Sequence, residues 1–231
     1  MDIKFGGQRS EVGGQRSEVE GQKSEVGGKK SEVGDQRSEV GEQKGEDILD
    51  MFRQSGALLE GHFLLTSGNH SDQYFQCAKV LQYPGYAEML CGIIAGQFKD
   101  KKIDVVVAPA IGGIVVGQEV ARQLGARSIF TERKDGKMQL RRGFEIQSGE
   151  RTLVCEDVVT TGGSVFEVID IVKKNGGILN GVGVIIDRSG GSVVFPVDHY
   201  IACYTTKAIV YSPGECPLCK EGSKPVKPGS R

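Results

Sequence analysis

One stretch, from Arg151 to Val165, constrains the fold of this chain more than any other; it reads RTLVCEDVVTTGGSV. It opens with a short apolar run that is typical of a buried strand, and a loop rich in threonine and glycine follows. Beyond the loop, apolar residues recur at helical spacing and share one helix face, at Val165, Val168, Ile169 and Val172. The stretch therefore predicts a strand, a short loop and the start of a helix.

The loop has the chemistry of an anion site. The free N–H groups in the first turn of a helix point at a ligand placed there, and the helix dipole favours negative charge. Gly162 and Gly163 permit a close approach of the backbone, and hydroxyl donors follow from Thr160, Thr161 and Ser164. We interpret the loop as a phosphate site. The alternative is an ordinary strand-to-helix turn in which threonine and glycine only cap the helix.

Two carboxylates directly before the loop further limit the kinds of ligand that it can bind. Glu156 and Asp157 would repel a bare phosphate, but they can accept hydrogen bonds from the vicinal hydroxyls of a sugar. The loop has no lysine after its glycines, as a P-loop requires, and no G-x-G-x-x-G follows the strand. The stretch therefore fits a phosphorylated sugar better than a nucleotide bound by a P-loop or by a G-x-G-x-x-G loop.

The segment LVCEDVVTTGGSV resembles the ribose-phosphate signature of type I phosphoribosyltransferases, and the resemblance extends from about Ile48 to Arg231. Within that family the chain is most similar to the branch that uses orotate. The resemblance implies an α/β fold, with a doubly wound, mostly parallel sheet of about five strands, helices on both faces and a small N-terminal hood. It also implies a homodimer that transfers ribose 5-phosphate from phosphoribosyl diphosphate to orotate with the help of Mg²⁺. The products would be orotidine 5′-phosphate and pyrophosphate, in pyrimidine (UMP) biosynthesis.

The resemblance also implies roles for individual residues. Asp157 would be catalytic and, with Glu156, would hold the ribose hydroxyls of phosphoribosyl diphosphate. The 5-phosphate would be bound by the loop residues Val158, Val159, Thr160, Thr161, Gly162, Gly163 and Ser164. Arg188 follows a predicted strand over residues 181–187 and, with the hydroxyl of Thr160, would hold orotate through its planar fork. No residue is implied as a direct ligand of Mg²⁺.

Five cations crowd into residues 132–144, at Arg133, Lys134, Lys137, Arg141 and Arg142. A charge run of this kind is usually a solvated face, but here it lies between two predicted strands of the sheet. The resemblance places the catalytic lid at this segment; mobile cationic lids neutralise a departing polyanion and exclude water. Arg133 and Lys134 would then bind phosphoribosyl diphosphate. Lys137, beside the glycine at the tip, would be the catalytic cation that reaches the partner subunit's site.

Three further segments complete the predicted domain. An entry helix begins at Ile48, and residues 61–76 read as a hairpin, which the resemblance places as the hood over the nucleobase. Residues 103–124 read as a buried strand, a glycine-rich loop and a helix, and the resemblance makes Ala110 to Gly113 the pyrophosphate loop. Part of the family has a lysine where Gly112 stands, so backbone N–H groups would bind more of the diphosphate here. On its own, this segment also reads as a plain strand-to-helix turn.

The first 47 residues are set apart by a heptapeptide repeat of the type GGQRSEV. Each repeat offers a single valine and most open with glycine, so the segment cannot bury enough apolar surface to offset the entropy of ordering it. We predict a disordered tail over residues 1–47 and a phosphoribosyltransferase domain over residues 48–231. The alternative for the tail is a role in binding.

Composition argues against other classes of partner. The net charge is −1, which gives no bulk field for nucleic acid or for an acidic membrane. No apolar run approaches the roughly 18 residues of a membrane span, and the six scattered cysteines suit reduced thiols. We therefore expect a cytoplasmic enzyme that binds neither nucleic acid nor membrane. One C-x-x-C, at Cys216 and Cys219, lacks a second ligand pair and is weak evidence for zinc within one chain or across a dimer.

Two rival functions are compatible with the same phosphate loop. The first is a purine phosphoribosyltransferase, and Arg188 argues against it because purine bases carry no carboxylate. The second is a non-catalytic regulator that keeps the fold and senses phosphoribosyl diphosphate, and the cationic lid argues against it.

Overall fold

The computed structural model describes residues 45–65, 67–207 and 209–228. The predicted disordered tail lies outside these residues apart from residues 45–47, for which the prediction was wrong because they are helical. A helix covers residues 45–54 and buries the apolar face that the sequence predicted for the entry helix, at Ile48, Leu49 and Phe52. These side chains join the main hydrophobic core, so the helix belongs to the folded domain.

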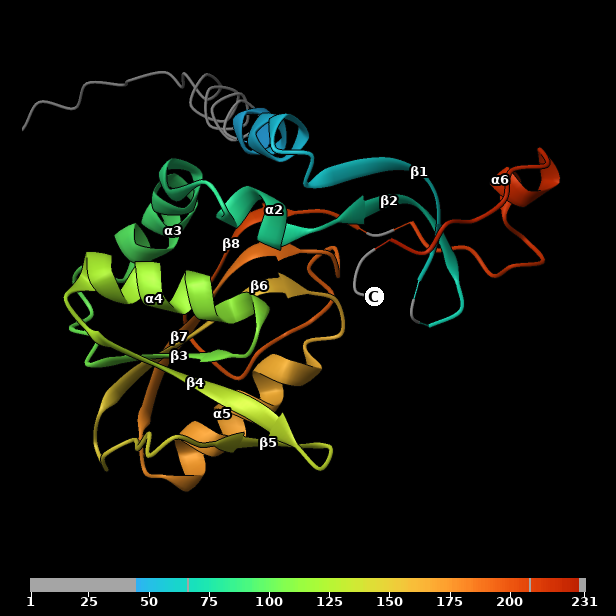
Figure 1. Cartoon of the computed structure of the whole chain (residues 1–231). Coiled ribbons are helices and arrows are strands. Elements are labelled where there is room, and N and C mark those ends of the chain that lie inside the picture. Colours follow the sequence, from blue (N-terminus) through green and yellow to red (C-terminus); the bar gives the residue numbers. More distant parts are fainter. Residues whose placement is uncertain (1–44, 66, 208, 229–231) are drawn as a thin grey trace, which may run out of the picture.

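Six strands form one sheet in the order β5-β4-β3-β6-β7-β8 (Figure 1). Every neighbouring pair is parallel except β4 and β5, which are antiparallel. The predicted doubly wound, mostly parallel sheet is therefore confirmed, although the two edge strands β5 and β8 were not predicted. The strands are β3 (Val105–Pro109), β4 (Arg127–Lys134), β5 (Lys137–Leu140), β6 (Arg151–Val159), β7 (Ile178–Asp187) and β8 (Tyr200–Thr205).

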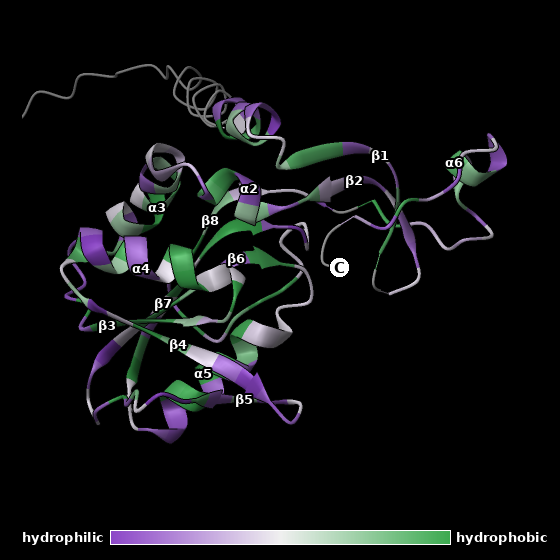
Figure 2. Cartoon of the chain, viewed as in Figure 1, coloured by the Kyte–Doolittle hydropathy of each residue, from purple (hydrophilic) through white to green (hydrophobic). Residues whose placement is uncertain are grey.

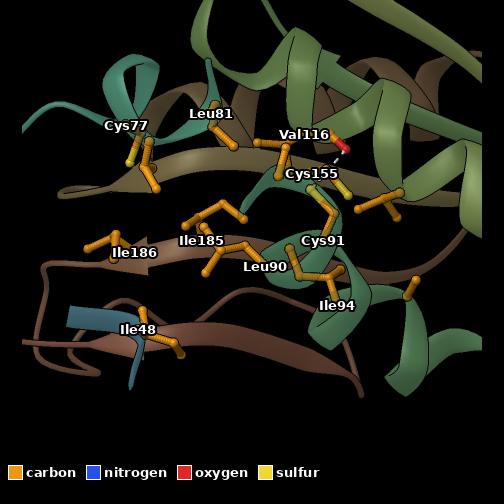
Figure 3. Packing of buried hydrophobic residues seen from close by; sticks show 14 of the residues in the cluster. Ile48, Cys77, Leu81, Leu90, Cys91, Ile94, Val116, Cys155, Ile185 and Ile186 are labelled. Atoms are coloured by element: carbon orange, nitrogen blue, oxygen red, sulfur yellow. Dashed lines mark hydrogen bonds between the residues drawn. The ribbon is translucent and has the colours of Figure 1, made fainter. Parts of the chain in front are cut away.

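Helices cover both faces of the sheet. Successive residues of a strand point to opposite sides, and in the central strands both sides are apolar and need covering. Val106 of β3 packs with α2, α3 and α4, whereas Val105 and Val107 pack with α5 on the other face. Figure 3 shows the first of these clusters, with Leu90 of α3 beside Ile185 of β7. The helices are α2 (Cys77–Leu81), α3 (Pro84–Phe98), α4 (Gly112–Leu124) and α5 (Gly163–Lys174).

A separate two-stranded hairpin forms the predicted hood. Strands β1 (Leu58–Leu64) and β2 (His70–Phe75) pair antiparallel. The segment after β8 runs back over this hairpin (Figure 1) and pairs with it at two isolated bridges, Phe63 with Val226 and His70 with Tyr211. This segment contains the short helix α6 (Pro217–Lys220). The hood is thus built from two parts of the chain, of which the sequence predicted only the hairpin.

The predicted lid is a β-hairpin and not an irregular loop. Strands β4 and β5 pair from Thr131 with Leu140 to Lys134 with Lys137. The two residues between them, Asp135 and Gly136, both have positive φ, 52° and 76°. That combination is the tight turn whose twist matches the flanking strands, and an Asp-Gly pair is its usual sequence.

Apolar residues are concentrated in the centre of the sheet. Figure 2 shows hydrophobic colouring in the central strands and hydrophilic colouring at the β4–β5 hairpin. Within the part of the chain that the structure describes, every helix is too short or too polar to cross a bilayer.

Candidate active site

The predicted phosphate loop lies at the edge of the sheet where the parallel strands β3, β6 and β7 end. Gly162, directly before α5, has φ of 76°, which favours glycine, and a Cβ there would lie 2.8 Å from Val193. The loop and the first turn of α5 border a cavity of about 240 Å³. Its lining residues are Arg133, Glu156, Val158, Val159, Thr160, Thr161, Gly162, Gly163, Ser164, Val165 and Glu167. The predicted phosphate residues are therefore brought together around one cavity.

The two acids lie within β6, which continues through Val159 and does not end before them as the sequence suggested. Glu156 is buried, and its Oε1 accepts the N–H of Asp157 at 3.0 Å. Asp157 Oδ1 accepts the N–H of Val158 at 2.9 Å. Burial, and then the negative charge of Asp157, raises the pKa of Glu156 to about 9. Burial and the charge of Asp157 thus favour the protonated form of Glu156, which can donate as well as accept a hydrogen bond beside the phosphate cavity.

The glycines of the predicted pyrophosphate loop lie against these acids. A Cβ built on Gly112 would come 2.7 Å from Asp157 Oδ1, and one on Gly113 would come 3.0 Å from Glu156 Oε1. Any side chain at position 112, including the lysine of other family members, would displace the Asp157 carboxylate. The fold thus brings the Ala110–Gly113 loop, which the resemblance makes the pyrophosphate loop, against the acid pair.

A second cavity of about 510 Å³ adjoins the first, and Thr160 and Thr161 line both. Its walls come from the hood hairpin, the end of β7 and the C-terminal segment. The lining residues are Leu64, Leu65, Ser67, Tyr74, Thr160, Thr161, Arg188, Ser189, Lys207, Val210, Lys227 and Pro228. The hood therefore covers a space large enough for a flat ring, next to the phosphate loop.

Arg188 gives the second cavity its chemical character. Its Nε is buried without a hydrogen-bond partner among the described residues, and its guanidinium carbon lies 5.7 Å from the centre of the Phe75 ring. Burial lowers the pKa of the Arg188 guanidinium. Buried polar groups are rarely left unpaired, and Arg188 lines the second cavity, so a half-buried cation without an ion pair favours an anionic ligand there.

The neighbouring carboxylate does not neutralise Arg188. Asp187 is fully buried, but its Oδ1 accepts the N–H of Ser189 at 2.7 Å and its Oδ2 accepts the hydroxyl of Tyr200 at 2.9 Å. The backbone N–H of Arg188 donates to the carbonyl of Val159 at 2.8 Å. These bonds fix the start of the loop after β7. None of them involves the guanidinium of Arg188, which stays available to a ligand.

Of the predicted lid cations, Arg133 alone lines the phosphate cavity. It is held there by Glu167 of α5, whose two carboxylate oxygens accept from Arg133 at 2.7 and 3.0 Å. The same guanidinium donates to the carbonyl of Gly136 at the hairpin turn, at 2.9 Å. Arg133 therefore fastens the lid hairpin to the helix that begins at the phosphate loop.

The other lid cations lie away from both cavities. Arg142 is paired with Glu132 through two bonds of 2.8 Å, and Arg141 lies 3.9 Å from the same carboxylate. Lys134 and Lys137 are exposed on the hairpin and line neither cavity. The five predicted cations are thus not one cluster: the three arginines are paired with acids, and the two lysines project into solvent.

Three charged residues at the cavities were missed by the sequence analysis: Glu167, Lys207 and Lys227. Glu167 lies one turn into α5, where an acid reads as part of a solvated helix face. The two lysines lie in the C-terminal segment, which has no periodic pattern and gave no reason to place it against the hood. No local signal marks them.

A family model described as "Phosphoribosyl transferase domain" matches residues 85–200. The orotate phosphoribosyltransferase of Chlorobium phaeobacteroides is 56% identical over 184 residues, which cover 80% of this chain and 95% of that protein. The protein of the same name from Desulforamulus reducens is 54% identical over 186 residues, covering 80% of this chain and 97% of the relative. The chain belongs to the orotate phosphoribosyltransferase family.

Solved structures agree on the fold but do not distinguish family members by substrate. An orotate phosphoribosyltransferase from Aeropyrum pernix superposes with a TM-score of 0.59 at 24% identity, over 68% of this chain and 93% of that one. An adenine phosphoribosyltransferase from Rhodothermus marinus reaches 0.57 at 18% identity, over 69% and 99% of the two chains. The fold is therefore that of type I phosphoribosyltransferases, and sequence identity places the chain among the orotate phosphoribosyltransferases.

Proposed function

We propose that the protein transfers ribose 5-phosphate from phosphoribosyl diphosphate to N1 of orotate, giving orotidine 5′-phosphate and pyrophosphate on the route to UMP. Family membership supports the reaction, and one observation in the structure supports the choice of base. Arg188 lines the cavity that adjoins the phosphate loop, and its guanidinium makes no hydrogen bond or ion pair with the described residues. Orotate carries a carboxylate, which can receive the planar fork of an arginine.

The two cavities define a pose for the donor. The 5-phosphate occupies the 240 Å³ cavity, where the backbone N–H groups of residues 162–164 and the hydroxyls of Thr160, Thr161 and Ser164 can donate to it. The ribose lies over Glu156 and Asp157, whose oxygens meet its vicinal hydroxyls. The diphosphate then points to Gly112 and Gly113, which lie against the acid pair.

The orotate ring occupies the 510 Å³ cavity under the hood, between Tyr74 and Arg188, with Thr160 at the boundary of the two cavities. Its ring nitrogen then faces the anomeric carbon of the ribose. Because the site holds the two reactants together in this orientation, the reaction does not depend on a bimolecular encounter between them. Orotate is already an anion, so no strong base is needed in the site.

Charge stabilisation accounts for the remaining chemistry. The bond from the anomeric carbon to the diphosphate breaks with oxocarbenium character, and the carboxylate of Asp157 lies on the ribose side of that bond. Negative charge accumulates on the leaving diphosphate, and the loop at Gly112 offers it only backbone N–H groups. The exposed lid lysines, Lys134 and Lys137, supply mobile cations for it.

Mg²⁺ fits this site as a cofactor held mainly by the substrate. Mg²⁺ prefers oxygen ligands and is usually bound by one or two carboxylates together with substrate phosphates. Among the described residues of the site, Asp157 offers such oxygens beside the pose of the diphosphate. When bound, Mg²⁺ would neutralise the diphosphate as it leaves.

We also propose a homodimer in a reducing cytoplasm. Apolar side chains are exposed on neighbouring helices, Met89 and Ile93 on α3 and Val115 on α4, and Ile111 between β3 and α4 is 85% exposed. An apolar patch of this kind favours burial against a second copy. Lys137 lies away from the cavities of its own chain, which fits a lid that serves the partner subunit. None of the six cysteines, all of which the structure describes, forms a disulfide, which fits a reducing compartment.

One assay tests the function. Orotate absorbance should decrease when the protein is mixed with orotate, phosphoribosyl diphosphate and Mg²⁺, and pyrophosphate should appear in equal amount. Parallel mixtures with adenine, guanine and hypoxanthine in place of orotate should release no pyrophosphate. Turnover of a purine and not of orotate would overturn the proposed substrate, and binding of phosphoribosyl diphosphate without turnover of any base would indicate a regulator.

A further inference from the structure

Four side chains outside the active site converge on one point. His62 of β1 and His70 of β2 come from the hood hairpin, and Cys216 and Cys219 flank the start of α6. Their ligand atoms all lie within 4.8 Å of one another. His62, His70 and Cys216 are buried, and Cys219 is half-buried. The second ligand pair that the C-x-x-C lacked in the sequence is therefore present in space.

From this arrangement we infer that the chain holds a structural Zn²⁺ ion between the hood hairpin and the C-terminal segment. The ligands are Nε2 of His62, Nδ1 of His70 and the Sγ atoms of Cys216 and Cys219. Two imidazoles and two thiolates form a ligand set typical of tetrahedral zinc. Because all four positions belong to the protein, the site is closed and has a structural role.

The interatomic distances fit such an ion. With Zn–S of about 2.3 Å and Zn–N of about 2.0–2.1 Å, a tetrahedron places nitrogen and sulfur about 3.5 Å apart and two nitrogens about 3.3 Å apart. Three of the four nitrogen–sulfur distances are 3.4 Å for His62 to Cys216, 3.7 Å for His62 to Cys219 and 3.3 Å for His70 to Cys219, and the fourth is within 4.8 Å. The two nitrogens are 2.9 Å apart. Small side-chain shifts convert this cluster into a coordination sphere.

The hydrogen bond on the far side of His62 supports a metal ligand. Its Nδ1 lies 3.1 Å from the carbonyl oxygen of Ser223. A carbonyl can only accept, so this Nδ1 carries the proton and the lone pair of the neutral ring is on Nε2, which faces the cluster. A backbone carbonyl that receives the second N–H of a histidine is the usual partner of a metal-binding ring.

The rival explanation is a metal-free cluster of hydrogen bonds. It would require the nitrogen of His70 or one of the two thiols to donate to His62, and thiols are weak donors. It would also leave the sequence Cys-Pro-Leu-Cys without a role, although its turn is folded tightly: the N–H of Lys220 donates to Cys216 and that of Gly222 to Cys219. The ion accounts for all four side chains at once.

The ion would join the two halves of the hood. Next to the cluster, the N–H of Val226 donates to His62 at 2.8 Å, and the N–H of Leu64 donates to Val226 at 2.9 Å. Leu64 and Lys227, the residues that follow His62 and Val226 closely in sequence, both line the 510 Å³ cavity. Releasing the ion should therefore loosen this wall. On the proposed function, the KM for orotate should rise more than the KM for phosphoribosyl diphosphate.

The test is the metal content of the full-length, untagged protein, purified without chelators. We expect about one zinc per chain by mass spectrometry of the metals. Cys219→Ser and His70→Gln should lower it at least several-fold, while the matched variants Cys203→Ser and His199→Gln, which lie outside the cluster, should retain it. Replacing zinc by Co²⁺ should give a thiolate charge-transfer band in the wild type and in the matched variants, and not in Cys219→Ser.

Two results would overturn the inference. One is wild-type protein without stoichiometric zinc that also gives no thiolate band when titrated with Co²⁺; the second measurement decides the matter even if the cluster variants fail to fold. The other is an equal loss of metal from the matched variants. Neither depends on catalysis, so an inactive protein that holds zinc would refute the proposed function and leave the metal site intact.

Discussion

Replacing Arg188 with alanine should weaken orotate binding without weakening the fold. The guanidinium is half-buried, its Nε has no partner among the described residues, and burial lowers its pKa. In the protein without ligand, burying this charge therefore costs desolvation free energy that no ion pair among the described residues offsets. An anionic ligand would offset it. The variant should have an unchanged or slightly higher melting temperature.

The size of the binding loss follows from the environment of Arg188. Truncating one partner of a buried, hydrogen-bonded charge pair costs about 2–5 kcal/mol. Because Arg188 is only half-buried and stacks on Phe75, we expect the lower end of that range. At about 1.4 kcal/mol for each factor of ten, this corresponds to a rise of roughly 30-fold or more in the KM for orotate.

The assay compares both substrates in three variants. In Arg188→Ala the KM for orotate should rise while the affinity for phosphoribosyl diphosphate, measured by calorimetry, stays near the wild-type value. Arg188→Lys should recover only part of the loss, because an ammonium lacks the planar fork. Arg122→Ala, which removes an exposed arginine paired with Glu119 on α4, is the matched control and should change neither value. Equal losses for both substrates, or a lower melting temperature, would mean that Arg188 supports the structure instead.

Three further predictions concern the acids and the lid. Gly112→Ala should displace the Asp157 carboxylate and reduce both the affinity for phosphoribosyl diphosphate and kcat, with little change in melting temperature; unchanged kinetics would show that the contact is unimportant. Because the folded pKa of Glu156 is raised from 4.5 to about 9, the protein takes up a proton on folding between these values. Its free energy of unfolding should therefore fall as pH rises through this window, by up to about 1.4 kcal/mol per pH unit, and denaturant titrations of Glu156→Gln should show a flatter profile. Mixing inactive Asp157→Asn and Lys137→Ala homodimers should restore about a quarter of wild-type activity once subunits exchange at random; background activity after exchange is verified by mass would refute a Lys137 that acts across the dimer.

The central layers could be predicted because their signals are local. The strand, loop and helix at residues 151–174 follow from an apolar run and a helical period, and the structure places the predicted face of α5 in the core. The edge strand β8 was missed because its residues are mostly half-buried and show no clean alternation. The β4–β5 hairpin was hidden by its charges, although Asp135 and Gly136 are a strong turn signal that was available in the sequence.

The hood could not be completed from the sequence, since its parts meet only in three dimensions. His62 and Cys216 are 154 positions apart; the C-x-x-C marks Cys216 only weakly, and nothing near His62 in the sequence marks it as its partner. Likewise, Lys207 and Lys227 reach the second cavity only because the C-terminal segment pairs with the hairpin. Spacing rules find metal sites whose ligands are close in the chain, and they fail where two distant pairs are joined by the fold.

Thr160 and Thr161 line both cavities, and this shared border has a consequence for inhibitor design. On the proposed function, a single small molecule could place a phosphate in one cavity and a flat acid in the other, with a spacer about as long as one pentose between them. Once one end is bound, the other binds at an effective concentration of the order of millimolar, and the linked compound can exceed either fragment in affinity by roughly 10²–10⁴. The distance across two threonines therefore sets the length of the spacer in such a bisubstrate compound.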